Sequence, residues 1–275
     1  MDYIELNLPA TEEMAEILTA ELAEYPFESF KQEGPILKAY IPQERLVDCK
    51  EQIDALLSDY QIEGARYISI ETQNWNALWE SNFSPVDVEG RIYIRAPFHD
   101  PAPEGVMEVV IMPKMSFGTG HHATTCLVSS YLLDLNIKAK EGLDMGSGTG
   151  VLAIVAAKCG ATHIDAVDID EWADENCREN IQTNGVEGQI TPLLGDVRRI
   201  AGRSYDFIAA NINRNILTGD MAAYVATMRP GADLVMSGFL EADIPIIRSA
   251  AEGAGLSFCS SRLRDGWAAV HCRRE

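Results

Sequence analysis

The sequence is poor in basic residues. Its 275 residues include 22 lysines and arginines against 42 aspartates and glutamates, which gives a net charge of −20. Proteins that bind nucleic acid directly place lysine and arginine against the phosphates. This chain is therefore a poor candidate for direct nucleic-acid binding, and its acidic field instead favours a basic protein or an amine as partner.

Cysteines and long apolar runs are also scarce. The six cysteines form no C-x-x-C pair, and no cysteine and histidine have the spacing of zinc ligands. We therefore expect buried thiols and no metal site. No apolar run reaches about 18 residues, and no basic-then-apolar leader opens the chain. The sequence thus predicts a cytoplasmic protein without a membrane span.

The first 72 residues read as a small separate domain. They hold 16 acidic and five basic side chains, so over half of the net charge lies in about a quarter of the chain. Apolar periodicity predicts strands at 3–8, 27–32, 36–41 and 67–71, and helices at 11–25 and from Pro42 onward. The order β-α-β-β-α-β matches the ferredoxin-like split unit, so we expect a ferredoxin-like α+β domain over residues 1–72.

The rest of the chain divides into a connector and a large α/β domain. Residues 73–112 are interpreted as a connector, with a short helix at Trp75–Trp79 and strands at 91–95 and 109–112. From residue 113 to 275 helices and strands alternate. The expected strands are 142–145, 164–168, 190–194, 206–212, 232–237, 256–259 and 267–272. Such alternation predicts a seven-stranded, doubly wound, Rossmann-like sheet.

A glycine-rich turn joins the first of these strands to a helix. Asp144 is followed by Gly146, Ser147, Gly148 and Gly150, and an apolar helix begins at once. Glycines let a backbone turn tightly and approach a ligand closely, and a helix N-terminus offers free N–H groups. Alone, such a turn is weak evidence for a ligand site, because any tight strand-to-helix turn can use glycine.

Polar residues at the ends of the next three strands strengthen that interpretation. Asp168 ends the second strand, Asp196 follows the third and Asn211 ends the fourth. In a parallel sheet these ends lie at one edge, where ligands bind. The acid-led G-x-G-x-G turn in register with them resembles class I S-adenosylmethionine-dependent methyltransferases. Dinucleotide enzymes instead carry G-x-G-x-x-G.

A second motif makes the resemblance specific. The segment Met-Ser-Phe-Gly-Thr-Gly-His-His-Ala-Thr-Thr over residues 115–125 reads as a polar flap before a helix at 126–135. Together with the glycine turn, Asp168-Ile-Asp170 and Ala-Asn-Ile at 210–212, this segment is similar to the PrmA family. Its members methylate ribosomal protein L11 of the large subunit. The two-domain order and Gly-Trp-Ala-Ala-Val around Trp267 fit the same family.

The resemblance implies a function and a set of site residues. It implies transfer of methyl groups from S-adenosylmethionine to the α-amino group and lysine ε-amino groups of L11, which the ferredoxin-like domain would bind. Separately, the small domain shows no large exposed apolar strip, so we expect a monomer, and the composition predicts that it requires neither membrane nor nucleic acid. The implied cofactor contacts are Thr125 (or Thr124 if the register is off by one), Gly146, Ser147, Gly148, Asp168, Ile169, Asp196 and Asn211. Among them, Asp168 would bind the ribose hydroxyls, Asp196 would face the adenine amine and Asn211 would lie near the reactive methyl. The implied catalytic residues are Asn211 and Trp267.

Several roles stay open at this point. Trp267 either lines the methyl-transfer pocket or belongs to the core, and His121 or His122 is a candidate proton acceptor. One alternative function is a class I methyltransferase acting on another protein or on nucleic acid. Adenine-amine enzymes carry Asn-Pro-Pro-aromatic, whereas this chain has Asn-Ile-Asn-Arg at 211–214. A nicotinamide oxidoreductase is a further alternative, but the third glycine falls at the wrong spacing for it. A binding module without catalysis stays open.

Overall fold

The chain forms two compact units. The computed structural model describes residues 3–70, 84–112 and 123–275. Contacts divide the chain into Met1–Phe83 and Ser84–Glu275. The helix expected at 75–79 and the flap at 115–122 lie outside the described residues. Within them, no helix is long and apolar enough to cross a bilayer.

The first unit has the expected ferredoxin-like topology. Its elements are β1 (Tyr3–Pro9), α1 (Glu12–Leu22), β2 (Ser29–Glu33), β3 (Ile36–Pro42), α2 (Gln43–Asp59) and β4 (Arg66–Ile70). The strand order is β2-β3-β1-β4, with antiparallel neighbours throughout. Thr11 caps α1 as the sequence predicts, because its Oγ1 accepts a hydrogen bond from Met14 N at 3.3 Å. Buried Leu18 of α1 and Ile53 of α2 pack with Leu6 of β1.

A three-stranded sheet opens the second unit. It contains β5 (Val86–Val88), β6 (Ile92–Arg95) and β7 (Met107–Val110), in that order. Asn184 binds β7 through two hydrogen bonds, from Val110 N to its Oδ1 at 3.0 Å and from its Nδ2 to Val110 O at 2.6 Å. Ile94 and Val109 belong to the core of the larger domain. Residues 84–112, interpreted from sequence as a connector, therefore pack as part of this unit.

The remaining elements form the predicted doubly wound domain. They are α4 (Ala123–Asp134), β8 (Glu141–Met145), α5 (Val151–Lys158), β9 (His163–Asp168), α6 (Glu171–Thr183), β10 (Ile190–Leu194), η1 (Val197–Ile200), β11 (Tyr205–Asn211), α7 (Arg214–Thr227), β12 (Met228–Leu240), η2 (Glu241–Asp243), α8 (Ile244–Gly253), β13 (Leu256–Arg264) and β14 (Trp267–Arg274). The strand order is β10-β9-β8-β11-β12-β14-β13. The first five strands are parallel, whereas β14 runs antiparallel to both neighbours.

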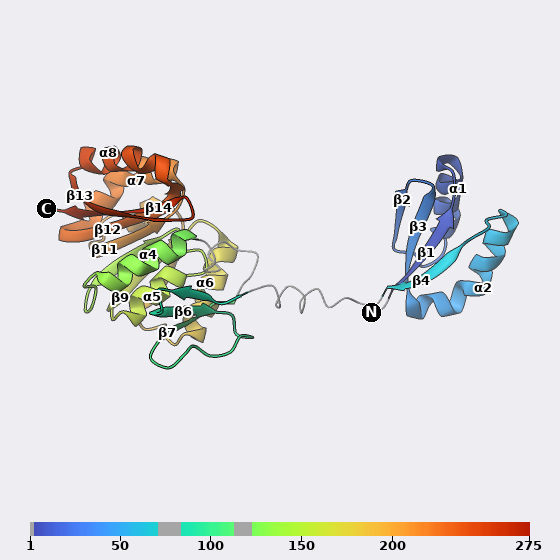
Figure 1. Ribbon diagram of the computed structural model, residues 1–275, viewed down its shortest axis with the longest axis horizontal. Coiled ribbons are helices and arrows are strands. Elements are labelled where there is room, and N and C mark those ends of the chain that lie inside the picture. The colour runs from blue at the N-terminus through green and yellow to red at the C-terminus, as the bar shows by residue number, and fades with distance from the viewer. Residues whose placement is uncertain (1–2, 71–83, 113–122) are drawn as a thin grey trace. The chain divides into compact units, whose positions relative to one another are not determined.

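Helices cover both faces of this sheet (Figure 1). Along β11, Phe207 and Ala209 join the core that contains α4 and α5, while Ile208 and Ala210 join the core that contains α7 and α8. This alternation with a period of two places one apolar layer on each face. The strand order reverses direction between β8 and β11, so the expected ligand site lies at their carboxyl ends.

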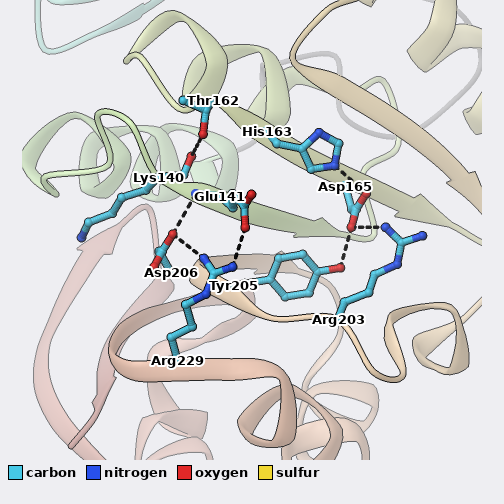
Figure 2. Close-up of polar contacts among 9 residues, drawn as sticks. All are labelled: Lys140, Glu141, Thr162, His163, Asp165, Arg203, Tyr205, Asp206 and Arg229. Carbon is cyan, nitrogen blue, oxygen red and sulfur yellow. Dashed lines mark hydrogen bonds and ion pairs between the residues drawn. The ribbon is translucent and has the colours of Figure 1, made fainter.

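A charged network lies at the amino-terminal ends of the strands, opposite the expected ligand site (Figure 2). Asp165 of β9, only 2% exposed, accepts hydrogen bonds from Tyr205 Oη at 2.7 Å and from the Arg203 guanidinium. Arg229 at the start of β12 forms ion pairs with Glu141 and Asp206. These contacts join the beginnings of four parallel strands. They leave the carboxyl ends of those strands free for a site.

Candidate functional site

The glycine turn between β8 and α5 has the conformation that its sequence demands. Gly146, Gly148 and Gly150 have φ values of 75°, 51° and 78°, in the left-handed region that favours glycine. The turn is held to β9 because Gly146 N donates to Val167 O at 2.8 Å. A Cβ on Gly146 would lie 2.1 Å from Ile212 Cγ2. Glycine is therefore required here both by the backbone and by the neighbouring loop.

Asp168 connects three loops at the end of β9. Its Oδ2 accepts from Gly148 N at 2.8 Å and its Oδ1 from Asp170 N at 3.1 Å. Its backbone carbonyl accepts from Gly195 N at 2.7 Å. Each carboxylate oxygen has two acceptor positions, so both oxygens retain capacity for a ligand's hydroxyl groups.

Asp144 is a buried carboxyl behind the glycine turn. It is 1% exposed, and its Oδ2 accepts from Ala153 N of α5 at 3.0 Å. Its Oδ1 has no hydrogen-bond partner among the described residues. Burial, with a smaller contribution from the negative charge of Asp168, raises the pKa of Asp144 to about 7. The carboxyl therefore holds the start of α5 from behind the glycine turn.

Asn211 ends β11 beside an unusually close backbone contact. Ile212 N donates to Ser237 O at 3.1 Å. Gly238 has a φ of 97°, and a Cβ on it would lie 2.3 Å from Ile212 O. The loop after β11 is therefore pressed against β12, which fixes where Asn211 emerges.

These loops enclose a cavity of about 610 Å³ at the carboxyl ends of the strands. This volume is in the range of small-molecule sites, about 300–1,000 Å³. The predicted site residues that line it are Thr125, Gly146, Ser147, Gly148, Asp168, Ile169, Asp196, Asn211 and Trp267. The structure thus brings every predicted site residue to one place. The roles assigned to them remain predictions.

Thr124 and Thr125 lie in a helix and not in the loop where the sequence predicts them. The sequence predicts a helix that begins at Cys126, but α4 begins at Ala123. Thr124 and Thr125 therefore lie in its first turn, where they are 3% and 1% exposed. Both line the cavity, so either register of the resemblance places a threonine there.

Asp196 is already bound to a basic side chain. Its Oδ1 accepts from Arg198 N and Nε at 3.0 and 2.9 Å, and its Oδ2 lies 2.7 Å from Arg198 Nη2. Hydrogen bonds from Arg198 lower the pKa of the Asp196 carboxyl. The carboxylate lines the cavity with much of its acceptor capacity in use.

A second cavity of about 480 Å³ adjoins the first. The two share Asn213, Gly238 and Trp267 as lining residues. An ion pair between Arg214 Nη1 and Asp243 Oδ1, 2.7 Å long, lies in its wall. Trp267 is half-buried and packs against the core, and it also lines both cavities.

Sequence reasoning missed several lining residues. These are Met145, Val151, Leu152, Val167, Gly195, Val197, Ile212, Asn213, Ile216, Asp220 and Gly238. Most lie in a helix or a strand, whereas the sequence argument selected mainly polar residues and glycines that follow strands, together with Ile169 and Trp267. Ser237-Gly238 after an apolar run was the one overlooked turn signal.

The electrostatics of the cavity favour a ligand with donors or positive charge. Asp168, Asp196 and Asp220 present carboxyl groups, while Ile169 and Ile216 present apolar surface. The described residues contain no group of three histidine, cysteine, aspartate or glutamate side chains that could hold a metal. The arrangement suits an organic ligand with hydroxyl and amino groups.

Known proteins with similar sequences are methyltransferases. The family model of ribosomal protein L11 methyltransferase (PrmA) matches residues 6–275. A ribosomal protein L11 methyltransferase from Porphyromonas gingivalis is 45% identical over 261 residues, covering 93% of this chain and 89% of the relative. One from Bacteroides thetaiotaomicron is 43% identical over 279 residues, covering 98% and 99%.

A solved structure confirms the fold. The ribosomal protein L11 methylase of Lactobacillus delbrueckii subsp. bulgaricus aligns with a TM-score of 0.64 and 21% identity, covering 70% of this chain and all of that chain. Because the family model spans nearly the whole chain and both relatives exceed 40% identity, the protein belongs to the ribosomal protein L11 methyltransferase (PrmA) family.

Proposed function

We propose that this protein transfers methyl groups from S-adenosylmethionine to the α-amino group and lysine ε-amino groups of ribosomal protein L11. The observation that carries the proposal is the single cavity lined by all nine predicted site residues in a chain of the PrmA family. We further propose that the enzyme is a cytoplasmic monomer that requires no nucleic acid, with the first unit binding the protein substrate.

The cavity offers complementary groups to each part of S-adenosylmethionine. The Asp168 carboxylate would accept hydrogen bonds from the ribose hydroxyls, since both of its oxygens keep free acceptor positions. Gly146, Ser147 and Gly148 would lie against the methionine portion and the ribose. The buried, unpartnered Asp144 Oδ1 lies behind this turn and would favour the positive charge of the donor.

The second cavity is where we expect the acceptor amine to enter. It shares Trp267 and Asn213 with the cofactor cavity, so a side chain entering it would meet the donor at Trp267. The indole would exclude water from one side of the reacting amine. Leu240, which is 50% exposed, would add apolar contact with the incoming segment.

Bound S-adenosylmethionine supplies an electrophilic methyl group on a sulfonium. The protein must present a neutral amine in line with it, although a lysine amine has a pKa near 10.4 in water. Desolvation beside Trp267 would lower that pKa. The Asn211 amide oxygen would accept a hydrogen bond from the amine and orient its lone pair. His121 and His122, proposed as proton acceptors, lie outside the described residues.

A methyl-transfer assay tests the proposal. Purified protein and S-adenosylmethionine with a labelled methyl group are mixed with total large-subunit ribosomal proteins and with ribosomal RNA in parallel. We expect label in L11 alone, with intact mass rising in steps of one methylene. Label in RNA would favour a nucleic-acid methyltransferase, whereas cofactor binding without label anywhere would favour a binding module.

A further inference from the structure

One carboxyl group in the cofactor cavity has no role in the proposed reaction. Asp220 lies in α7, four residues after Ile216, so both side chains project from the same face of the helix. Both line the cavity of about 610 Å³. The described residues give Asp220 no ion pair with a basic side chain, which distinguishes it from Asp196.

Asp196 and Asp220 both line the cavity, and the charge of Asp196 reaches Asp220. Burial raises the pKa of the Asp220 carboxyl, and the negative charge of Asp196 raises it further. The Asp196 oxygens are engaged by the backbone and side chain of Arg198 at 2.7–3.0 Å. Tyr224, four residues further along α7, is a hydrogen-bonding neighbour of the Asp220 carboxyl. No basic side chain among the described residues engages that carboxyl, so Asp220 keeps more acceptor capacity toward the cavity than Asp196 does.

The apolar surroundings of Asp220 suit a flat ring. Ile169 at the end of β9 is 72% exposed and Ile216 is 43% exposed, although both line the cavity. Their exposed apolar surface would be covered by an aromatic ring packed against them. A carboxyl group at the edge of that ring would accept a hydrogen bond from an exocyclic amine.

From this arrangement we infer that Asp220, and not Asp196, recognises the 6-amino group of the adenine in the methyl donor. The inference rests on the proposed function, because it takes the ligand to be S-adenosylmethionine. It assigns Asp196 a different part: with Arg198 it caps η1 and shapes the loop beside the ring. Neither the sequence motifs nor the resemblance pointed to a residue within α7.

The test compares two ligands that differ at this position of the ring. S-adenosylhomocysteine carries the 6-amino group, whereas S-inosylhomocysteine carries a carbonyl oxygen there and would face the carboxyl with an acceptor. Binding is measured by calorimetry on the full-length protein, with thermal unfolding to verify that each variant is folded. We expect the wild-type protein to prefer S-adenosylhomocysteine.

The variants separate the two aspartates. Asp220→Ala is expected to reduce the preference about tenfold, the usual effect of losing a hydrogen bond to a charged group. Asp220→Asn retains an acceptor oxygen and should keep most of the preference, and it also serves if the alanine variant unfolds. The matched control, Asp196→Ala, should leave the preference within about threefold of wild type.

Each outcome has a defined meaning. An unchanged preference in Asp220→Ala, or a loss confined to Asp196→Ala, would overturn the inference and leave the proposed function intact. Failure of the wild-type protein to bind either ligand would overturn the proposed function and the inference with it.

Discussion

Asn211 is the residue on which the proposed chemistry depends most directly. It lines the cofactor cavity at the end of β11, and its side chain forms no hydrogen bond with the described residues. We expect Asn211→Ala to lower kcat about 10- to 100-fold, because the amine would lose its orienting acceptor. The dissociation constant of S-adenosylhomocysteine should change less than about threefold. Steady-state kinetics and calorimetry provide the comparison, and equal losses in both would exclude an orienting role.

Asp144 gives a pH-dependent prediction for the cofactor-free protein. Its pKa is raised to about 7, above the value of about 3.9 for a solvated aspartate. Because its pKa is higher in the folded protein than in the unfolded chain, Asp144 stabilises the fold when it is protonated. This contribution to the free energy of unfolding is fully present below about pH 4 and is lost as the pH rises through 7. The full cost of ionisation is on the order of 4 kcal/mol.

Asp144→Asn removes that ionisation while preserving the shape of the side chain. Relative to wild type, the variant should therefore gain free energy of unfolding as the pH rises from 5 to 8. Chemical denaturation at both pH values measures the change. A variant equally destabilised at the two values would show that Asp144 does not titrate in this range.

At the scale of elements, β12 is built around the contact between Gly238 and the Ile212 backbone. A methyl group at position 238 would lie 2.3 Å from Ile212 O. The residue that carries it would also have to adopt a φ of 97°. Gly238→Ala should lower the free energy of unfolding by about 2–4 kcal/mol and displace the loop that carries Asn211. Turnover should then fall together with stability.

The same strand offers a matched control. Gly231 has a φ of 79°, but a Cβ there meets nothing within 4 Å. Gly231→Ala should therefore cost only the backbone strain of about 1–2 kcal/mol and leave turnover unchanged. Similar kinetics for the two variants would argue against the steric explanation. Denaturation and methyl-transfer rates distinguish them.

The sequence predicted the parallel strands well, because short apolar runs between helices are buried as strands of a central sheet. Strand β10 matches its predicted range of 190–194, and β8, β9 and β11 differ from theirs by one residue at either end. Strand β5 was missed, since Val86-Asp-Val88 is too short for a pattern. The sequence predicts the start of β12 at residue 232, but the strand extends back to Met228.

The candidate site could be predicted only at positions after a strand where the residue type itself has a clear physical reason. Glycines with positive φ and an acid after β9 satisfy that condition. Asp220 and Ile216 do not, because their contribution depends on which face of α7 turns toward the sheet. Sequence also could not show that Asp196 is bound by Arg198, a contact set by the local geometry of η1.

At the scale of the whole molecule, the negative charge is concentrated. Helix α1 carries four glutamates and no basic residue, and all four glutamates are exposed. A field of this kind accelerates the approach of a basic partner and weakens as salt screens it. The first unit therefore has the charge expected of a surface that attracts a ribosomal protein.

This charge distribution predicts a selective effect of salt. Raising ionic strength from about 50 to 300 mM should raise the KM for L11 about tenfold, because screening shortens the reach of the field. The dissociation constant of S-adenosylhomocysteine, which binds in a cavity, should change less than about twofold. The reversal pair Glu12→Lys and Glu16→Lys in α1 should raise the KM at low salt and flatten its salt dependence.

The control places the same change of charge in the second unit, at exposed Glu175 and Glu187. If the field of the first unit guides the substrate, reversing these two should alter the KM much less than reversing the α1 pair. Equal effects would mean that only the net charge of the chain matters, since distant charges would then contribute alike. No effect of salt in any variant would show that L11 is held by uncharged contacts, and the acidity of the first unit would then need another explanation.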